Sequence, residues 1–149
     1  MYKLTRTETF SACHRLTASH LSPEENERLF GKCGRRHGHN YTLEVTVCGP
    51  LDPACGMVLS VSELKRIIRE RVLEDFDHAS LEDDVAEFAA VSNGVGKSGR
   101  LSTAENVARI IWERLEPHLH HRLYKVKLRE TDKNVVTYKG PTEWSAAGR

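Results

Sequence analysis

The segment from residue 37 to residue 48, HGHNYTLEVTVC, alternates strictly between two kinds of side chain. Its odd positions hold two imidazoles followed by large apolar side chains: His37, His39, Tyr41, Leu43, Val45 and Val47. In an extended chain, successive side chains point to opposite faces, so a pattern that repeats every two residues predicts a β-strand with one buried face. Both imidazoles therefore point toward the face that the apolar residues cover.

Two neutral imidazoles on a buried face need partners, and a metal ion that accepts a lone pair from each would provide them. A third ligand is available in ETFSACHRL, where Phe10, Ala12 and His14 share one face of an extended chain. Three imidazoles match the nitrogen ligands that Zn²⁺ prefers, and they leave a fourth position open for water or substrate. We predict a catalytic zinc site on His14, His37 and His39; the alternative is three ordinary histidines with hydrogen-bonded partners.

The rest of the chain predicts three strands, two helices and two further strands, in that order. The strands are expected at residues 2–10, 37–48, 56–61, 123–130 and 135–140, and the helices at 62–76 and 102–117. Ser62 and a Ser102–Glu105 capping box are the expected helix starts. This order predicts an α+β domain with both helices on one face of an antiparallel sheet.

Length and charge limit the possible partners. With 149 residues the chain is expected to form a single domain at 1–140 with a loose tail at 141–149. Lys and Arg total 22 against 21 Asp and Glu, both scattered, which predicts no nucleic-acid or membrane-surface partner and favours a small molecule. No apolar run is long enough to span a bilayer and the N-terminus does not resemble a secretory signal, so a cytoplasmic location and reduced cysteines are expected.

Cys33 precedes the histidine pair in CGRRHGHNY and has two possible roles. As a fourth zinc ligand it would close the site and make it structural. As a thiolate beside the metal it would act as a base or nucleophile, with Lys32, Arg35 and Arg36 available to lower its pKa. The residues alone leave both roles open, whereas Cys13, Cys48 and Cys55 are interpreted as small packing residues.

Two other places carry ionisable groups of interest. Asp77 and His78 follow the first helix, and adjacent residues can form a working pair there only if the chain turns. Glu130 continues the even face of its strand after Tyr124, Val126 and Leu128, so its carboxylate needs a partner such as two parallel N–H groups of a ligand. The remaining histidines are interpreted as solvated loop or helix-end residues: His20, His118, His120 and His121.

Several motifs occur together in a specific order: FSACHRL, CGRRHGHNY, LDPACGMVLSVSELK, the DH pair, STAENVA and RETDKNVVTYKG. In these motifs the chain resembles the 6-pyruvoyl-tetrahydropterin synthase family from about Tyr2 to Gly140. The resemblance implies the tunnelling fold, whose units assemble into trimeric barrels. Pairs of trimers form homohexamers with active sites between subunits.

The resemblance also implies roles for individual residues. Zinc would bind the three histidines described above, and Cys33 would be the general base. Asp77 and His78 would form a proton relay supplied by a neighbouring subunit.

The implied substrate is 7,8-dihydroneopterin triphosphate, and the implied product is 6-pyruvoyl-tetrahydropterin, formed with elimination of triphosphate. Glu130 would anchor the amino-pyrimidine edge of the pterin, and Thr103 and Glu105 would lie near its pocket. Arg35 and Arg36 are candidate triphosphate contacts.

Two alternatives remain. Only three residues separate Cys33 from HGH, as in bacterial relatives that make 6-carboxy-tetrahydropterin for queuosine from the same substrate. The other alternative is a zinc-stabilised protein that binds pterin or a partner without turnover.

Overall fold

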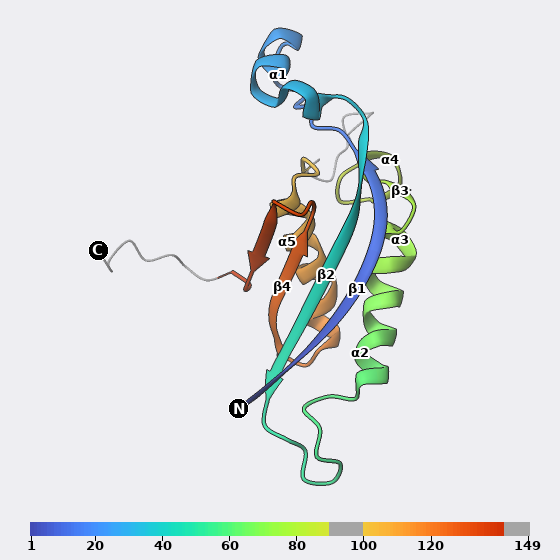
Figure 1. The fold of residues 1–149 in the computed structure, drawn as a ribbon, viewed down its shortest axis with the longest axis vertical. Coiled ribbons are helices and arrows are strands. Elements are labelled where there is room, and N and C mark those ends of the chain that lie inside the picture. Colours follow the sequence, from blue (N-terminus) through green and yellow to red (C-terminus); the bar gives the residue numbers. More distant parts are fainter. Residues whose placement is uncertain (90–99, 142–149) are drawn as a thin grey trace, which may run out of the picture.

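The computed structural model describes residues 1–89 and 100–141 of the chain. Its centre is a five-stranded sheet in the order β3-β1-β2-β4-β5 (Figure 1). The long strands β1 (Tyr2–His14) and β2 (His37–Gly49) pair antiparallel along their whole length, from Tyr2 opposite Gly49 to His14 opposite His37. The alternating segment is therefore a strand, as predicted, and the predicted N-terminal strand continues as far as His14.

The other strands are shorter. Strand β4 (Leu123–Arg129) pairs antiparallel with β2, and β5 (Val135–Tyr138) pairs antiparallel with β4. The two-residue strand β3 (Ala79–Ser80) runs parallel to β1. The sheet is thus antiparallel, as predicted, except at this short edge strand.

Two helical segments contact the sheet, as the apolar spacing of the sequence predicts. The first comprises α2 (Val61–Ile68), a π-helical stretch η2 (Arg69–Leu73) and α3 (Glu74–Phe76). The second is α5 (Ala104–Leu115), followed by the short 3-10 turn η3 (Glu116–His118). In Figure 1, α2 lies beside β1 and α5 lies behind β4.

The buried faces of these elements form one hydrophobic core. Both helices place their buried stripe against the same face of the sheet, which carries these side chains: Phe10, Ala12, Tyr41, Leu43, Val45, Val126 and Leu128. Burying a large apolar side chain stabilises a fold by about 1.5–3 kcal/mol. The three histidines lie on this same face, at the end of it where β1 finishes and β2 begins.

Short helical turns occupy the connections. Helix α1 (Pro23–Phe30) begins after Ser22, which forms a capping box, and is followed by the 3-10 turn η1 (Gly31–Gly34). The turn α4 (Leu81–Asp84) follows β3 directly. Both connections lie close to the ends of β1 and β2 that carry the histidines (Figure 1).

The prediction of a third strand at residues 56–61 is wrong. Val58 and Leu59 are both buried, so consecutive side chains enter the core from an irregular segment that pairs with no strand. The first helix begins at Val61 with Ser60 in the capping position, two residues earlier than a Ser62 cap would require. A short apolar run can bury its side chains in the core without pairing with another strand, so its apolar character alone does not identify a strand.

Two smaller predictions also need correction. Thr103, and not Ser102, caps α5 by accepting a hydrogen bond from the Asn106 backbone N–H, because the Ser102 hydroxyl has a tertiary partner, Glu82. Tyr124 does not share the buried face of β4, because a register shift between Thr46 and Val47 places Leu123 there instead.

Among the described residues, no helix is long and apolar enough to cross a membrane. The segment SNGVGKSGR at 92–100, whose glycines indicate a surface loop, and the predicted tail at 141–149 lie almost entirely outside the described residues. The domain bounds 1–140 therefore stay a prediction.

Candidate metal centre and active site

The pairing of β1 with β2 brings three histidines together. His14 lies directly opposite His37, and His39 lies two residues further along β2, opposite Ala12. One nitrogen from each imidazole falls within 4.8 Å of the other two, and the ring centroids are 4.6–5.1 Å apart. The three histidines that parity places on one face therefore lie together, and their donor atoms converge on one point.

Hydrogen bonds orient two of the rings. His14 Nδ1 donates to the Ser102 carbonyl at 2.8 Å, and His37 Nδ1 donates to the Arg35 carbonyl at 2.7 Å. A proton on Nδ1 leaves the lone pair on Nε2, which is the arrangement that metal-bound histidines show. The outer hydrogen bonds thus prepare both imidazoles to act as ligands.

The electrostatic state of the cluster also favours metal binding. His14 is only 2% exposed, and its Nε2 is buried without a hydrogen-bond partner among the described residues. Burial lowers the pKa of His39; the Glu130 carboxylate opposes this shift and the two neighbouring imidazoles add to it, so that the net shift favours the neutral ring. A divalent cation would satisfy the orphaned nitrogen, so the donor set fits a metal ion.

Glu130 lies just beyond the end of β4 and faces the histidines. Its Oε1 is 3.8 Å from His14 Nε2 and 3.7 Å from His39 Nε2, too far for hydrogen bonds. The Glu130 backbone N–H donates to the Asn134 carbonyl at 3.1 Å, which fixes the residue at the β4–β5 turn. Its carboxylate follows the buried side chains of Val126 and Leu128, as the alternation predicts.

A cavity of about 610 Å³ opens beside this cluster. Its size is typical of small-molecule sites. Seven of the predicted site residues line it: His14, Cys33, His37, His39, Thr103, Glu105 and Glu130. Thr103 and Glu105 reach it because they form the start of α5, which points its N-terminus at the cavity wall.

Cys33 lies at the rim of the cavity, on η1. The Cys33 carbonyl accepts a hydrogen bond from the Leu16 N–H at 2.8 Å, which ties η1 to the chain leaving β1. Its thiol is exposed, and it does not belong to the group of donor atoms that lie within 4.8 Å of one another among the described residues. This placement favours a group beside the metal over a fourth ligand.

Asp77 and His78 do not line this cavity. The chain turns at His78, whose φ is +66°, and the two side chains meet with Oδ1 of Asp77 3.1 Å from Nδ1 of His78. Asp77 also accepts the Ser11 N–H at 2.9 Å, and this hydrogen bond, helped by His78, lowers the pKa of Asp77. The turn that an Asp–His pair requires is present, but the pair is exposed and apart from the histidine cluster of its own chain.

Sequence reasoning missed part of the cavity wall. The missed residues are Leu16, Ala104, Thr131, Lys133, Asn134, Val135 and Val136. Lys133 is the cationic residue among those that line the cavity, whereas the Arg36 guanidinium binds Asp83 and Ser80 elsewhere. The signal was present in the turn TDKN, because a hairpin turn directly after Glu130 must stay near that carboxylate.

A three-histidine centre beside a cavity that also presents a thiol and carboxylates is the arrangement expected of a metal-dependent enzyme that acts on a small molecule. The family model described as 6-pyruvoyl tetrahydropterin synthase matches residues 3–141. The chain belongs to this family.

Individual relatives agree. A Drosophila melanogaster protein named 6-pyruvoyl tetrahydrobiopterin synthase is 47% identical over 142 residues, which cover 93% of this chain and 79% of the relative. The structure of Caenorhabditis elegans 6-pyruvoyl tetrahydropterin synthase superposes with a TM-score of 0.83 at 40% identity, covering 94% of this chain and 96% of that one. A 6-carboxy-5,6,7,8-tetrahydropterin synthase from Haemophilus influenzae is 29% identical over 150 residues, covering 93% and 99%.

Proposed function

We propose that this protein is a 6-pyruvoyl-tetrahydropterin synthase, a lyase that converts 7,8-dihydroneopterin triphosphate to 6-pyruvoyl-tetrahydropterin and releases triphosphate. The observation that carries the proposal is the convergence of three imidazole nitrogens beside a cavity that also holds Cys33 and Glu130. Membership of the family supplies the substrate class.

The proposed metal is zinc, bound by His14, His37 and His39. An all-nitrogen set of three imidazoles suits Zn²⁺ and leaves a coordination position for substrate. Bound zinc would act as a Lewis acid on hydroxyl oxygens of the substrate side chain, which makes the neighbouring C–H and O–H protons more acidic.

The other residues would orient the substrate and move protons. Glu130 accepts two parallel N–H groups from the amino-pyrimidine edge of the pterin, close to Thr103 and Glu105 at the start of α5. Cys33, as the thiolate, takes a proton from the side chain at the cavity rim. Lys133 is placed to attract the triphosphate, in place of Arg36, whose guanidinium is paired with Asp83.

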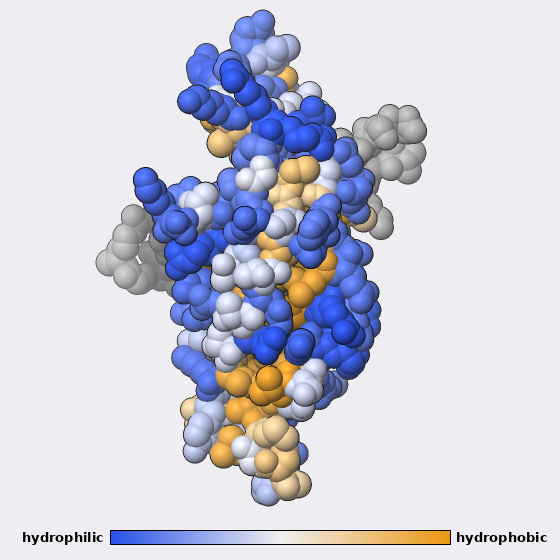
Figure 2. Space-filling model, turned by 45° about the vertical axis from the view of Figure 1, so that its right-hand side comes forward, coloured by the Kyte–Doolittle hydropathy of each residue, from blue (hydrophilic) through white to orange (hydrophobic). Residues whose placement is uncertain are grey.

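The proposed assembly is a homohexamer made of two trimeric barrels. Among the described residues, β1 pairs with β3 only at Ala12 and Cys13, and β5 pairs only with β4, so two strand edges stay open. Open edges invite pairing with another chain. Figure 2 shows an apolar band along one side of the molecule, which a neighbouring subunit would cover. Such a neighbour would bring its Asp77 and His78 to the cavity as a proton relay.

Two alternative functions are kept as outcomes of the test. The short spacing between Cys33 and the HGH motif is the reason to consider a 6-carboxy-tetrahydropterin synthase, but the identity to that kind of relative is 29%, against 47% to a 6-pyruvoyl tetrahydrobiopterin synthase. A zinc-stabilised protein without turnover is the second alternative. The cytoplasmic location stays a prediction.

A product assay distinguishes the three functions. Purified protein supplied with zinc and dihydroneopterin triphosphate is expected to release triphosphate and form 6-pyruvoyl-tetrahydropterin, as resolved by chromatography under anaerobic conditions. Formation of 6-carboxy-tetrahydropterin with acetaldehyde would assign the alternative enzyme. If zinc-loaded protein forms no product, the proposal that it is an enzyme is wrong.

Replacing Glu130 with Gln is expected to raise KM at least about tenfold, because the amide keeps one acceptor oxygen but loses the paired acceptors and the charge that hold two N–H groups. Steady-state kinetics with zinc analysis of the same preparation checks the result. Zinc content should stay at the wild-type level. Loss of zinc instead would show that Glu130, whose carboxylate lies 3.7 Å from His39 Nε2, is a metal ligand and not the pterin anchor.

A further inference from the structure

Glu82 closes a ring of hydrogen bonds around His14. The Glu82 Oε1 accepts from the backbone N–H of Arg15 at 3.2 Å and from the hydroxyl of Ser102. The carbonyl of the same Ser102 accepts from His14 Nδ1 at 2.8 Å. One carboxylate oxygen therefore holds both the residue that follows His14 in the chain and the residue that orients the His14 ring.

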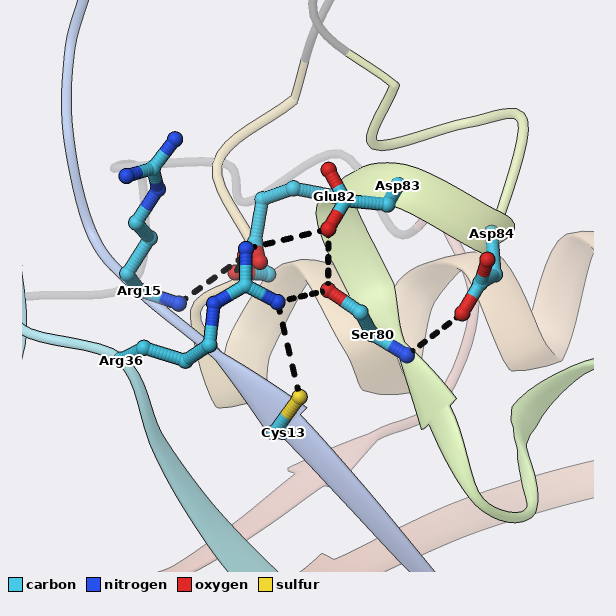
Figure 3. A network of polar contacts seen from close by, with 8 residues as sticks. Cys13, Arg15, Arg36, Ser80, Glu82, Asp83 and Asp84 are labelled. Atoms are coloured by element: carbon cyan, nitrogen blue, oxygen red, sulfur yellow. Dashed lines mark hydrogen bonds and ion pairs between the residues drawn. The ribbon is translucent and has the colours of Figure 1, made fainter.

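The turn that carries Glu82 is itself fixed to the metal-binding end of the sheet (Figure 3). The Arg36 guanidinium donates to Asp83 at 3.0 Å, and the Ser80 hydroxyl donates to the same carboxylate at 2.7 Å. Asp84 closes the turn by accepting the Ser80 N–H at 2.7 Å. Since Arg36 immediately precedes His37, α4 contacts the chain next to a ligand on each of the two long strands.

The position of Glu82 is not explained by stability alone. Its second oxygen, Oε2, is buried and has no hydrogen-bond partner among the described residues. A buried acceptor without a partner costs free energy, and an apolar residue on this turn would avoid the cost. What the carboxylate provides is the two hydrogen bonds that Oε1 accepts from Arg15 and Ser102.

From this geometry we propose that Glu82 is a positioning residue for the metal centre, acting on His14 through Ser102. Metal affinity depends on how well the imidazole is held in its donor orientation, and outer hydrogen bonds to a ligand contribute about 10- to 100-fold to affinity. Ser102 lies in the segment just before α5, so its carbonyl is held in place by the α5 cap on one side and by Glu82 on the other. The inference rests on the proposed zinc site.

The test measures metal affinity, not turnover. The assembled protein is stripped of metal and titrated with zinc against a chromophoric chelator, and the visible spectrum of its cobalt(II) form reports ligand geometry. Glu82→Ala and Ser102→Ala are each expected to lower zinc affinity about 10- to 100-fold and to change the cobalt spectrum. The double variant should lose no more than the stronger single variant, because both remove the same link.

Two further variants separate positioning from general damage. Glu82→Gln keeps an oxygen that accepts from Arg15 and Ser102, so it should restore most of the affinity. Glu74→Ala removes an exposed carboxylate from α3, outside the turn that carries Glu82 and outside the ring around His14, so it should bind zinc like the wild type.

The proposal is overturned if Glu82→Ala binds zinc with wild-type affinity, or if Glu74→Ala loses as much affinity as Glu82→Ala. A wild-type protein that binds no zinc would overturn the metal site itself, which is a different result.

Discussion

Replacing His37 with alanine is expected to abolish stoichiometric zinc binding and to lower turnover at least about a thousandfold. Two imidazoles cannot hold a divalent ion tightly, and a Lewis acid of this kind stabilises the developing charge by several kcal/mol, where each 1.36 kcal/mol corresponds to about tenfold in rate. Metal analysis of the purified variant and its rate of triphosphate release check the two expectations separately.

His37 is the best ligand for this experiment. Unlike His14, which is 2% exposed and packed in the core, it is only partly buried, so its truncation should leave the fold intact. A matched control is His20→Ala, which removes an exposed imidazole from the loop before α1. The control should keep full zinc content and activity. Zinc retained at full stoichiometry in His37→Ala would contradict the three-histidine site.

Alternation in a strand is the reason that the histidine cluster could be predicted. In β2 the repeat of two extends without interruption over His37, His39 and Tyr41, and β1 carries His14 on the face of Phe10. Once the strands pair, parity alone puts the three rings on one face. The exact register, with His14 opposite His37, follows from the full-length pairing, which the sequence did not specify.

The prediction failed where tertiary contacts override local pattern. Val58 and Leu59 satisfy their burial in an irregular segment, so an apolar run was mistaken for a strand. At the start of α5, Ser102 and Thr103 are both good capping residues, and only the distant partner Glu82 decides that Thr103 forms the cap. Contacts between residues about 20 apart or more in the chain leave no trace in a local repeat.

The same limit applies to the candidate site. Glu130 was found because a carboxylate interrupts an apolar face, and this signal is local to β4. Glu82 lies in an acidic run, LEDD, that looks like ordinary solvated surface in the sequence. Its link to His14 needs three segments to meet, and only the folded chain brings them together.

The second large effect is expected at Cys33. Replacing it with alanine should lower kcat about 10²- to 10⁴-fold, the usual contribution of a well-placed general base, and should change KM little. Cys33→Ser should be as impaired as Cys33→Ala, because a hydroxyl is a much weaker base than a thiolate although it fits the same space. Cys55→Ala, which truncates an exposed cysteine in the β2–α2 connection, is the matched control and should turn over normally.

Zinc content measured on the same Cys33 variants decides between the two roles that the sequence left open. If Cys33 is a fourth ligand, replacing it should lower zinc affinity. If it is a base beside the metal, replacing it should leave zinc affinity near the wild-type level. The thiol lies outside the cluster of donor atoms within 4.8 Å but on the wall of the same cavity, so we expect zinc to be retained and the rate to fall. Triphosphate release as fast in Cys33→Ala as in the wild type would assign the proton transfer to another group.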